Sequence, residues 1–140
     1  FAPIAAYFFI DRWKEEKNKT FFSSEARAVW FTLQETEDFS YKIDLLLEKN
    51  KVISYNDFDI FQQFAEQLTF CLNRVHYFHE LTDDSEIGKK NDYYISAQDT
   101  YHFMIEGNLF SLDEDQKQRR ELIKVNEELR KLLIKHIIIK

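Results

Sequence analysis

The chain has 140 residues and a net charge of −6, with two glycines, one proline and one cysteine. This length suits one domain with a sizeable core, and so few glycines cannot build the close backbone approaches that nucleotide sites commonly use. The single cysteine excludes an internal disulfide and a cysteine-based zinc site. We therefore predict an all-α fold, a helical bundle of four or five helices with a long N-terminal helix.

The chain opens with ten almost wholly apolar residues, Phe1 to Ile10, and a basic segment follows up to Lys19. A membrane helix needs about 20 apolar residues, so we interpret the ten as the end of a span whose earlier part would precede Phe1. The alternative is a wholly soluble helical adaptor that buries the same ten residues in its own core. We accordingly divide the chain into 1–19, the end of the candidate span with its juxtamembrane segment, and 20–140, a helical cytoplasmic domain.

The residues after the apolar run support the membrane interpretation. Aromatic residues gather near the headgroups of a bilayer, and positive charges gather on its cytoplasmic side. The predicted membrane-interface residues are Tyr7, Arg12, Trp13 and Lys14. We therefore expect a membrane-associated protein whose domain lies on the cytoplasmic side.

Beyond Lys19, apolar residues recur at helical spacing from Phe22 to Leu33 and again from Phe39 to Leu47. The polar stretch 34–38 separates the two runs, and we predict one nearly continuous helix across it. A second helix is predicted from about Asn56 to Leu81, with an apolar face wide enough to contact neighbours on two sides. The polar segment 82–92 is predicted to be a loop.

A shorter helix is predicted from Tyr93, ending in a left-handed cap at Gly107. Ser111 and Glu114 match the serine-to-glutamate capping box that opens the last helix. That helix carries apolar residues at alternating spacings of three and four and ends in an apolar tail. These residues either pack onto the bundle or mediate self-association or binding of a protein partner: Leu122, Val125, Leu129, Leu132, Ile137, Ile138 and Ile139.

Arg74 and His79 are separated by four residues near the end of the second predicted helix. This spacing resembles the signature of HEPN ribonucleases, although Val75 stands where that family usually has a polar residue. The resemblance implies an all-helical domain in which Arg74 and His79 cleave RNA at a dimer interface. The structural alternative is that Arg74 pairs with an acid and His79 packs at the end of an apolar stripe.

Charge argues against nucleic acid as a partner of the main body. Residues 20–110 carry seven basic and sixteen acidic residues, and an acidic surface repels a phosphate backbone. A metal site built from His76, His79 and Glu80 with His102 and Glu106 lacks the Glu-x-x-His pairs of helical di-iron proteins. We predict no metal and no cofactor, and a surface pair between His102 and Glu106.

The sequence thus favours a non-enzymatic, membrane-anchored helical interaction or oligomerisation module on the cytoplasmic side. Two alternatives stay open. One is the HEPN-like ribonuclease, and the other is the soluble helical adaptor.

Overall fold

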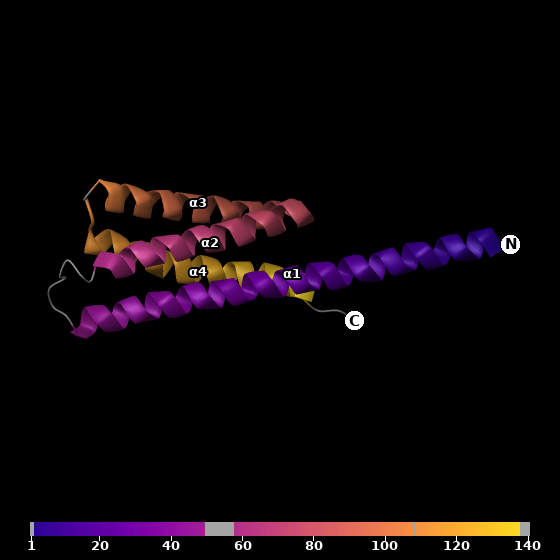
Figure 1. Cartoon of the computed structure of the whole chain (residues 1–140), viewed down its shortest axis with the longest axis horizontal. Coiled ribbons are helices and arrows are strands. Elements are labelled where there is room, and N and C mark those ends of the chain that lie inside the picture. The colour runs from indigo at the N-terminus through magenta and orange to yellow at the C-terminus, as the bar shows by residue number, and fades with distance from the viewer. Residues whose placement is uncertain (1, 50–57, 108, 138–140) are drawn as a thin grey trace.

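The computed structural model describes residues 2–49, 58–107 and 109–137, and the side chains of residues 2–11 and 13–16 lie outside that description. The described residues form four helices and no strand, which confirms the predicted all-α bundle. The helices are α1 (Ala2–Lys49), α2 (Phe58–Thr82), α3 (Ser85–Glu106) and α4 (Leu112–Ile137). α1 and α3 each pack against both α2 and α4, so the four helices enclose one core (Figure 1).

α1 is a single helix across the polar stretch 34–38, as predicted. Its core-facing residues follow alternating spacings of three and four, the repeat of packed bundle helices. These residues are Ala26, Val29, Leu33, Thr36, Ser40 and Ile43. The buried Thr36 hydroxyl donates to the backbone oxygen of Thr32 at 2.8 Å. The same hydroxyl accepts a hydrogen bond from Nε2 of Gln67 on α2 at 3.2 Å, so this polar position is satisfied and does not interrupt the helix.

α1 also extends well past the ends of the other three helices (Figure 1). At about 1.5 Å per residue, its 48 residues span roughly 72 Å, whereas the 25 residues of α2 span roughly 38 Å. Of the predicted membrane-interface residues, Arg12 is exposed, and the side chains of Tyr7, Trp13 and Lys14 lie outside the described residues. The described parts of the helices contain no stretch that is long and apolar enough to cross a membrane.

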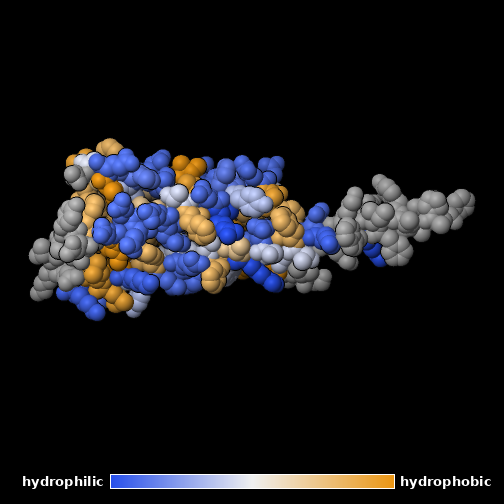
Figure 2. Space-filling model, in the orientation of Figure 1, coloured by the Kyte–Doolittle hydropathy of each residue, from blue (hydrophilic) through white to orange (hydrophobic). Residues whose placement is uncertain are grey.

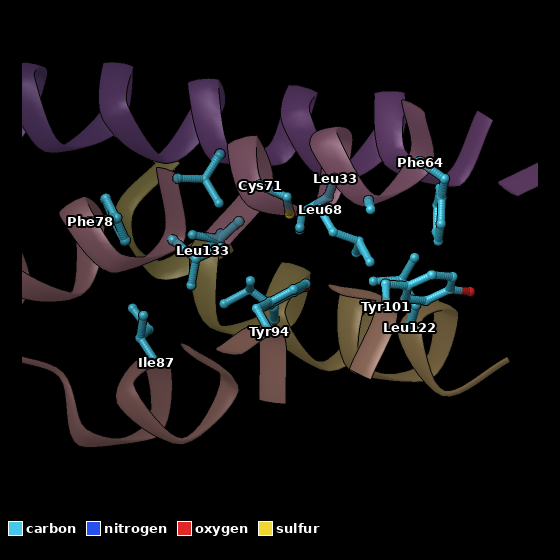
Figure 3. Close-up of a cluster of buried hydrophobic side chains, with 14 of the residues drawn as sticks. Leu33, Phe64, Leu68, Cys71, Phe78, Ile87, Tyr94, Tyr101, Leu122 and Leu133 are labelled. Atoms are coloured by element: carbon cyan, nitrogen blue, oxygen red, sulfur yellow. The ribbon is translucent and has the colours of Figure 1, made fainter. Parts of the chain in front are cut away.

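α2 lies between α1 and α3 and supplies much of the core (Figure 3). Its wide apolar face contributes seven buried residues: Phe61, Phe64, Ala65, Leu68, Cys71, Val75 and Phe78. They meet Leu33 of α1, Tyr94 and Tyr101 of α3, and Leu122 and Leu133 of α4. The predicted contact of this helix with neighbours on two sides is confirmed.

The predicted loop over 82–92 is wrong, because α3 begins at Ser85. Only Asp83 and Asp84 separate α2 from α3. Asp83 takes a left-handed conformation with φ 52°, which an aspartate tolerates better than most residues. The Asp84 carboxylate then accepts a hydrogen bond from the backbone nitrogen of Glu86 at 2.9 Å, which caps α3.

Gly88 lies inside α3 and does not mark a turn. A Cβ at this position would lie 2.8 Å from Cε1 of His79, so the glycine permits close packing of α3 on the end of α2. Gly107 ends α3 where predicted, but its φ of −84° is right-handed. The predicted left-handed cap at Gly107 is therefore wrong. The predicted start of α4 is confirmed by the Ser111 hydroxyl, which accepts a hydrogen bond from the backbone nitrogen of Glu114 at 3.3 Å.

Candidate interaction surface

The buried seam of α4 mixes leucines with charged and amide side chains. Counting backwards from Leu129 in steps of three and four gives Leu122, but also three polar residues that are at most 3% exposed: Asp115, Arg119 and Asn126. Sequence reasoning missed these three, because it followed apolar residues only. The seam ends at Leu133 and not at the predicted Leu132, which is partly buried.

Arg119 joins α4 to α1. Its Nη1 donates to the backbone oxygen of Ser40 at 3.0 Å and also pairs with Asp44. Its Nε donates to Oδ2 of Asp115 at 3.1 Å, while Nη2 lies 3.0 Å from the same oxygen without a well-directed hydrogen bond. A guanidinium in this position holds two helices in one register, because its planar fork allows few alternative arrangements.

Asp115 is the counter-charge of this cluster and is fully buried. The hydroxyl of Tyr101 donates to its carboxylate and, at 3.3 Å, to its backbone oxygen. Burial raises the pKa of Asp115 above its ordinary value, and the hydrogen bonds from Arg119 and Tyr101 partly offset that rise. A cavity of about 290 Å³ adjoins the cluster and is lined by Ser40, Asp44, Gln116, Arg119, Arg120 and Ile123. Since Arg119 is already held by two carboxylates, we assign the cluster to helix pairing.

The residues predicted to bind a partner fall into three groups. Leu122 and Leu129 are at most 1% exposed and belong to the core of the bundle. Val125, Leu132 and Ile137 are partly buried against that core. Ile138 and Ile139 lie outside the described residues. Leu122 and Leu129 are therefore out of reach of a partner, and an acidic residue at Leu129 should unfold the bundle.

An apolar groove lies nearby, on the outside of the same helix pair. It has a volume of about 450 Å³ and is lined by Arg27, Trp30 and Phe31 of α1 and by Ile134 and Ile137 of α4. The Ser23 hydroxyl donates to the backbone oxygen of Ile137 at 3.1 Å, which holds the end of α4 on α1. Phe31 is 66% exposed and Ile134 is 41% exposed.

Trp30, which lines the groove, also contacts a charged group of α4. Arg130 of α4 lies over the Trp30 ring, 5.6 Å from its centroid, and forms an ion pair with Glu37. These contacts fix the position of Trp30.

Figure 2 shows that apolar patches interrupt the hydrophilic surface at both ends of the bundle on the face in view. A preformed apolar recess beside exposed aromatic side chains is typical of a protein-binding surface.

The arginine and histidine of the HEPN resemblance both have local contacts. The Arg74 guanidinium lies over the ring of Phe70 at 5.4 Å, and no acid of the described residues forms an ion pair with it. His79 Nδ1 lies 3.0 Å from the backbone oxygen of Asp84, at the turn into α3. His79 therefore packs at the helix end as expected from the structural alternative, but the expected acid partner of Arg74 is absent there.

The histidine and glutamate residues considered for a metal form separate surface pairs. His102 Nδ1 lies 3.6 Å from Glu106 Oε1, which confirms that predicted pair, and His76 Nε2 lies 2.9 Å from Glu80 Oε1. No cluster of three or more metal-ligating side chains occurs within residues 17–49, 58–107 and 109–137. Neither pair is joined by a third ligand in that part of the chain.

Comparison with known protein families, curated proteins and solved structures gives no match to this chain.

Proposed function

We propose that the protein is a non-enzymatic interaction module, held at the cytoplasmic side of a membrane by the N-terminal end of α1. One observation carries this proposal: α1 runs without a break from the bundle to Ala2 and passes the ends of the other helices (Figure 1). A continuous helix is a stiff connection, so its first turns are presented at a fixed distance from the bundle.

The residues at the start of the chain have the composition expected of a membrane tether. Phe1 to Ile10 are almost wholly apolar, and exposed Arg12, Lys17 and Lys19 follow them. Such a basic segment beside an apolar one favours the cytoplasmic face of a bilayer. The backbone of these turns lies beyond the ends of α2, α3 and α4. This supports the membrane tether rather than the alternative in which the segment is buried in the core of the bundle.

The interaction itself is assigned to the groove between α1 and α4. Leu122 and Leu129 are used inside the bundle, whereas Trp30, Phe31 and Ile134 offer apolar area outside it. Burial of such area stabilises a complex by roughly 25 cal/mol per Å² before the costs of association. The proposed mechanism is therefore docking of an apolar surface into this groove, with the membrane fixing its orientation.

Membrane fractionation of the native protein tests the tether. We expect the protein to stay in the membrane pellet after a carbonate wash and to need detergent for release. Deletion of residues 1–10 should shift it toward the supernatant, because about half of the candidate span is then lost. Phe103→Asp should not, because Phe103 is a 68% exposed residue of α3. A native protein that appears in the supernatant without detergent would contradict the tether and favour the soluble adaptor.

A further inference from the structure

The outer face of α1 carries both parts of a self-complementary contact. Phe31 projects from it with 66% of its surface exposed, and the groove formed with α4 opens beside it. A two-fold symmetric interface needs this arrangement, since one surface must supply both the inserted group and its recess. A second copy of the chain can thus place its Phe31 in this groove while its own groove receives the first copy's Phe31.

Charge along α1 selects the direction of that contact. Residues 17–30 contain three basic residues and one acidic residue, whereas residues 32–49 contain two basic and five acidic residues. Two of these five acids pair with arginines of α4, which leaves Glu35, Asp38 and Glu48 outside those ion pairs. Arg27 and Glu35 lie one helical turn to either side of Phe31, and both are exposed. Neither forms an ion pair with another residue of the described ranges. Parallel pairing would set like charges together, whereas antiparallel pairing sets the basic half against the acidic half.

We propose that two copies of this chain associate through the outer face of α1, antiparallel, with Phe31 of each copy in the groove between α1 and α4 of the other. The proposal rests on the interaction surface assigned above and names its partner as a second copy. The two N-terminal arms then point in opposite directions. If both arms are tethered, the pair links two membrane surfaces that face each other.

The mass of the full chain in solution tests the association, in mild detergent if fractionation shows that detergent is needed. We expect sedimentation over a concentration series to give a dimer, and Phe31→Ser to give a monomer. Phe103→Ser is the matched control, because this phenylalanine is equally exposed, at 68%, but lies on α3. Circular dichroism should show all three proteins equally helical. A monomeric native chain, or a dimer that survives Phe31→Ser, would overturn the proposal.

The direction of pairing is tested with a spin label at Lys42→Cys, an exposed position on α1. Lys42 lies eleven residues from Phe31, so in an antiparallel pair centred near Phe31 the two labels are about 33 Å apart along the helices. In a parallel pair they are separated by little more than the interhelical distance of about 10 Å. The fully buried Cys71 should not react, because burial raises the pKa of its thiol to about 12. A short distance would overturn antiparallel pairing.

A charge change at Arg27, which lines the groove, gives a third readout that leaves the apolar lining residues Trp30, Phe31 and Ile134 unchanged. Arg27→Glu places an acid opposite the partner's acidic half, so we expect the dimer to dissociate at a concentration at least tenfold higher. Arg27→Lys keeps the charge and should have little effect. Equal affinity for Arg27→Glu and the native chain would contradict the charge argument. These masses and distances are independent of membrane fractionation, so a failed self-association and a failed tether can be told apart.

Discussion

Replacement of Arg119 by methionine tests how the bundle depends on its buried charges. Arg119 is 3% exposed, and Asp115, which it pairs with, is fully buried. Methionine fills similar space but leaves the Asp115 carboxylate with the Tyr101 hydroxyl as its one remaining side-chain donor. Removal of one member of a buried ion pair costs about 3–5 kcal/mol, because the other charge stays in a poorly solvating interior. We expect the free energy of unfolding to fall by that amount at pH 7.

The loss of stability caused by Arg119→Met should depend on pH, in a direction that follows from the pKa of Asp115. Burial already raises the pKa of Asp115 above its ordinary value of 3.8. The folded chain therefore binds more protons than the unfolded chain in this range, and the contribution of Asp115 to stability falls as pH rises through the folded-state pKa. Without the guanidinium, that pKa rises further. The loss caused by Arg119→Met should thus be smaller at about pH 4.5 than at pH 7.

Urea unfolding followed by circular dichroism measures these differences. Arg120→Met is the matched control, since Arg120 is exposed and its loss should change stability by no more than about 0.5 kcal/mol. Asp115→Asn combined with Arg119→Met should recover most of the loss, because no buried charge then remains unpaired. A loss below about 1 kcal/mol at pH 7, or no recovery in the double variant, would refute the reasoning.

Two further predictions concern the contacts of α3. Gly88→Ala should lower the free energy of unfolding by about 1–3 kcal/mol, because the new Cβ would lie 2.8 Å from His79 Cε1. Thermal unfolding measures this loss, and an equal loss in a His79→Ala background would contradict the steric cause. Tyr94→Phe should lower the free energy of unfolding in urea by about 1–3 kcal/mol. The Tyr94 hydroxyl donates to Oδ1 of the buried Asn126, whose Nδ2 has no hydrogen-bond partner among the described residues. Combination with Asn126→Leu should reduce that loss, and an undiminished loss would contradict the hydrogen-bond explanation.

Local patterns were sufficient where one kind of residue filled a helix face. The apolar positions of α2 are large and regularly spaced, so their burial followed from periodicity alone. The start of α4 followed from Ser111, because a capping hydroxyl acts within one turn. The pairing of His102 with Glu106 likewise depends only on neighbours along one helix.

Local patterns were insufficient where a residue's role depends on another helix. Gly88 looked like a loop residue, but the close approach of His79 from α2 explains it. Asp115, Arg119 and Asn126 were missed because the sequence reasoning followed apolar residues only. Their burial depends on hydrogen-bond partners on α1 and α3. Charged residues at the spacing of a helix core are buried only when each has an ion-pair or hydrogen-bond partner. That partner is distant in the sequence, so spacing alone does not reveal the burial.

The sequence by itself determined the helical class, the long first helix and the apolar run at its start, because helix formation and hydrophobic periodicity depend on neighbouring residues. Only the tertiary structure decided which face of α4 is buried and which apolar residues remain outside as a groove. Antiparallel packing of α1 and α4 brings Arg119 to Asp44, residues 75 positions apart. The same packing buries Leu129 and leaves Phe31 exposed, a division that depends on how the helices are rotated against each other and not on the hydrophobicity of either residue.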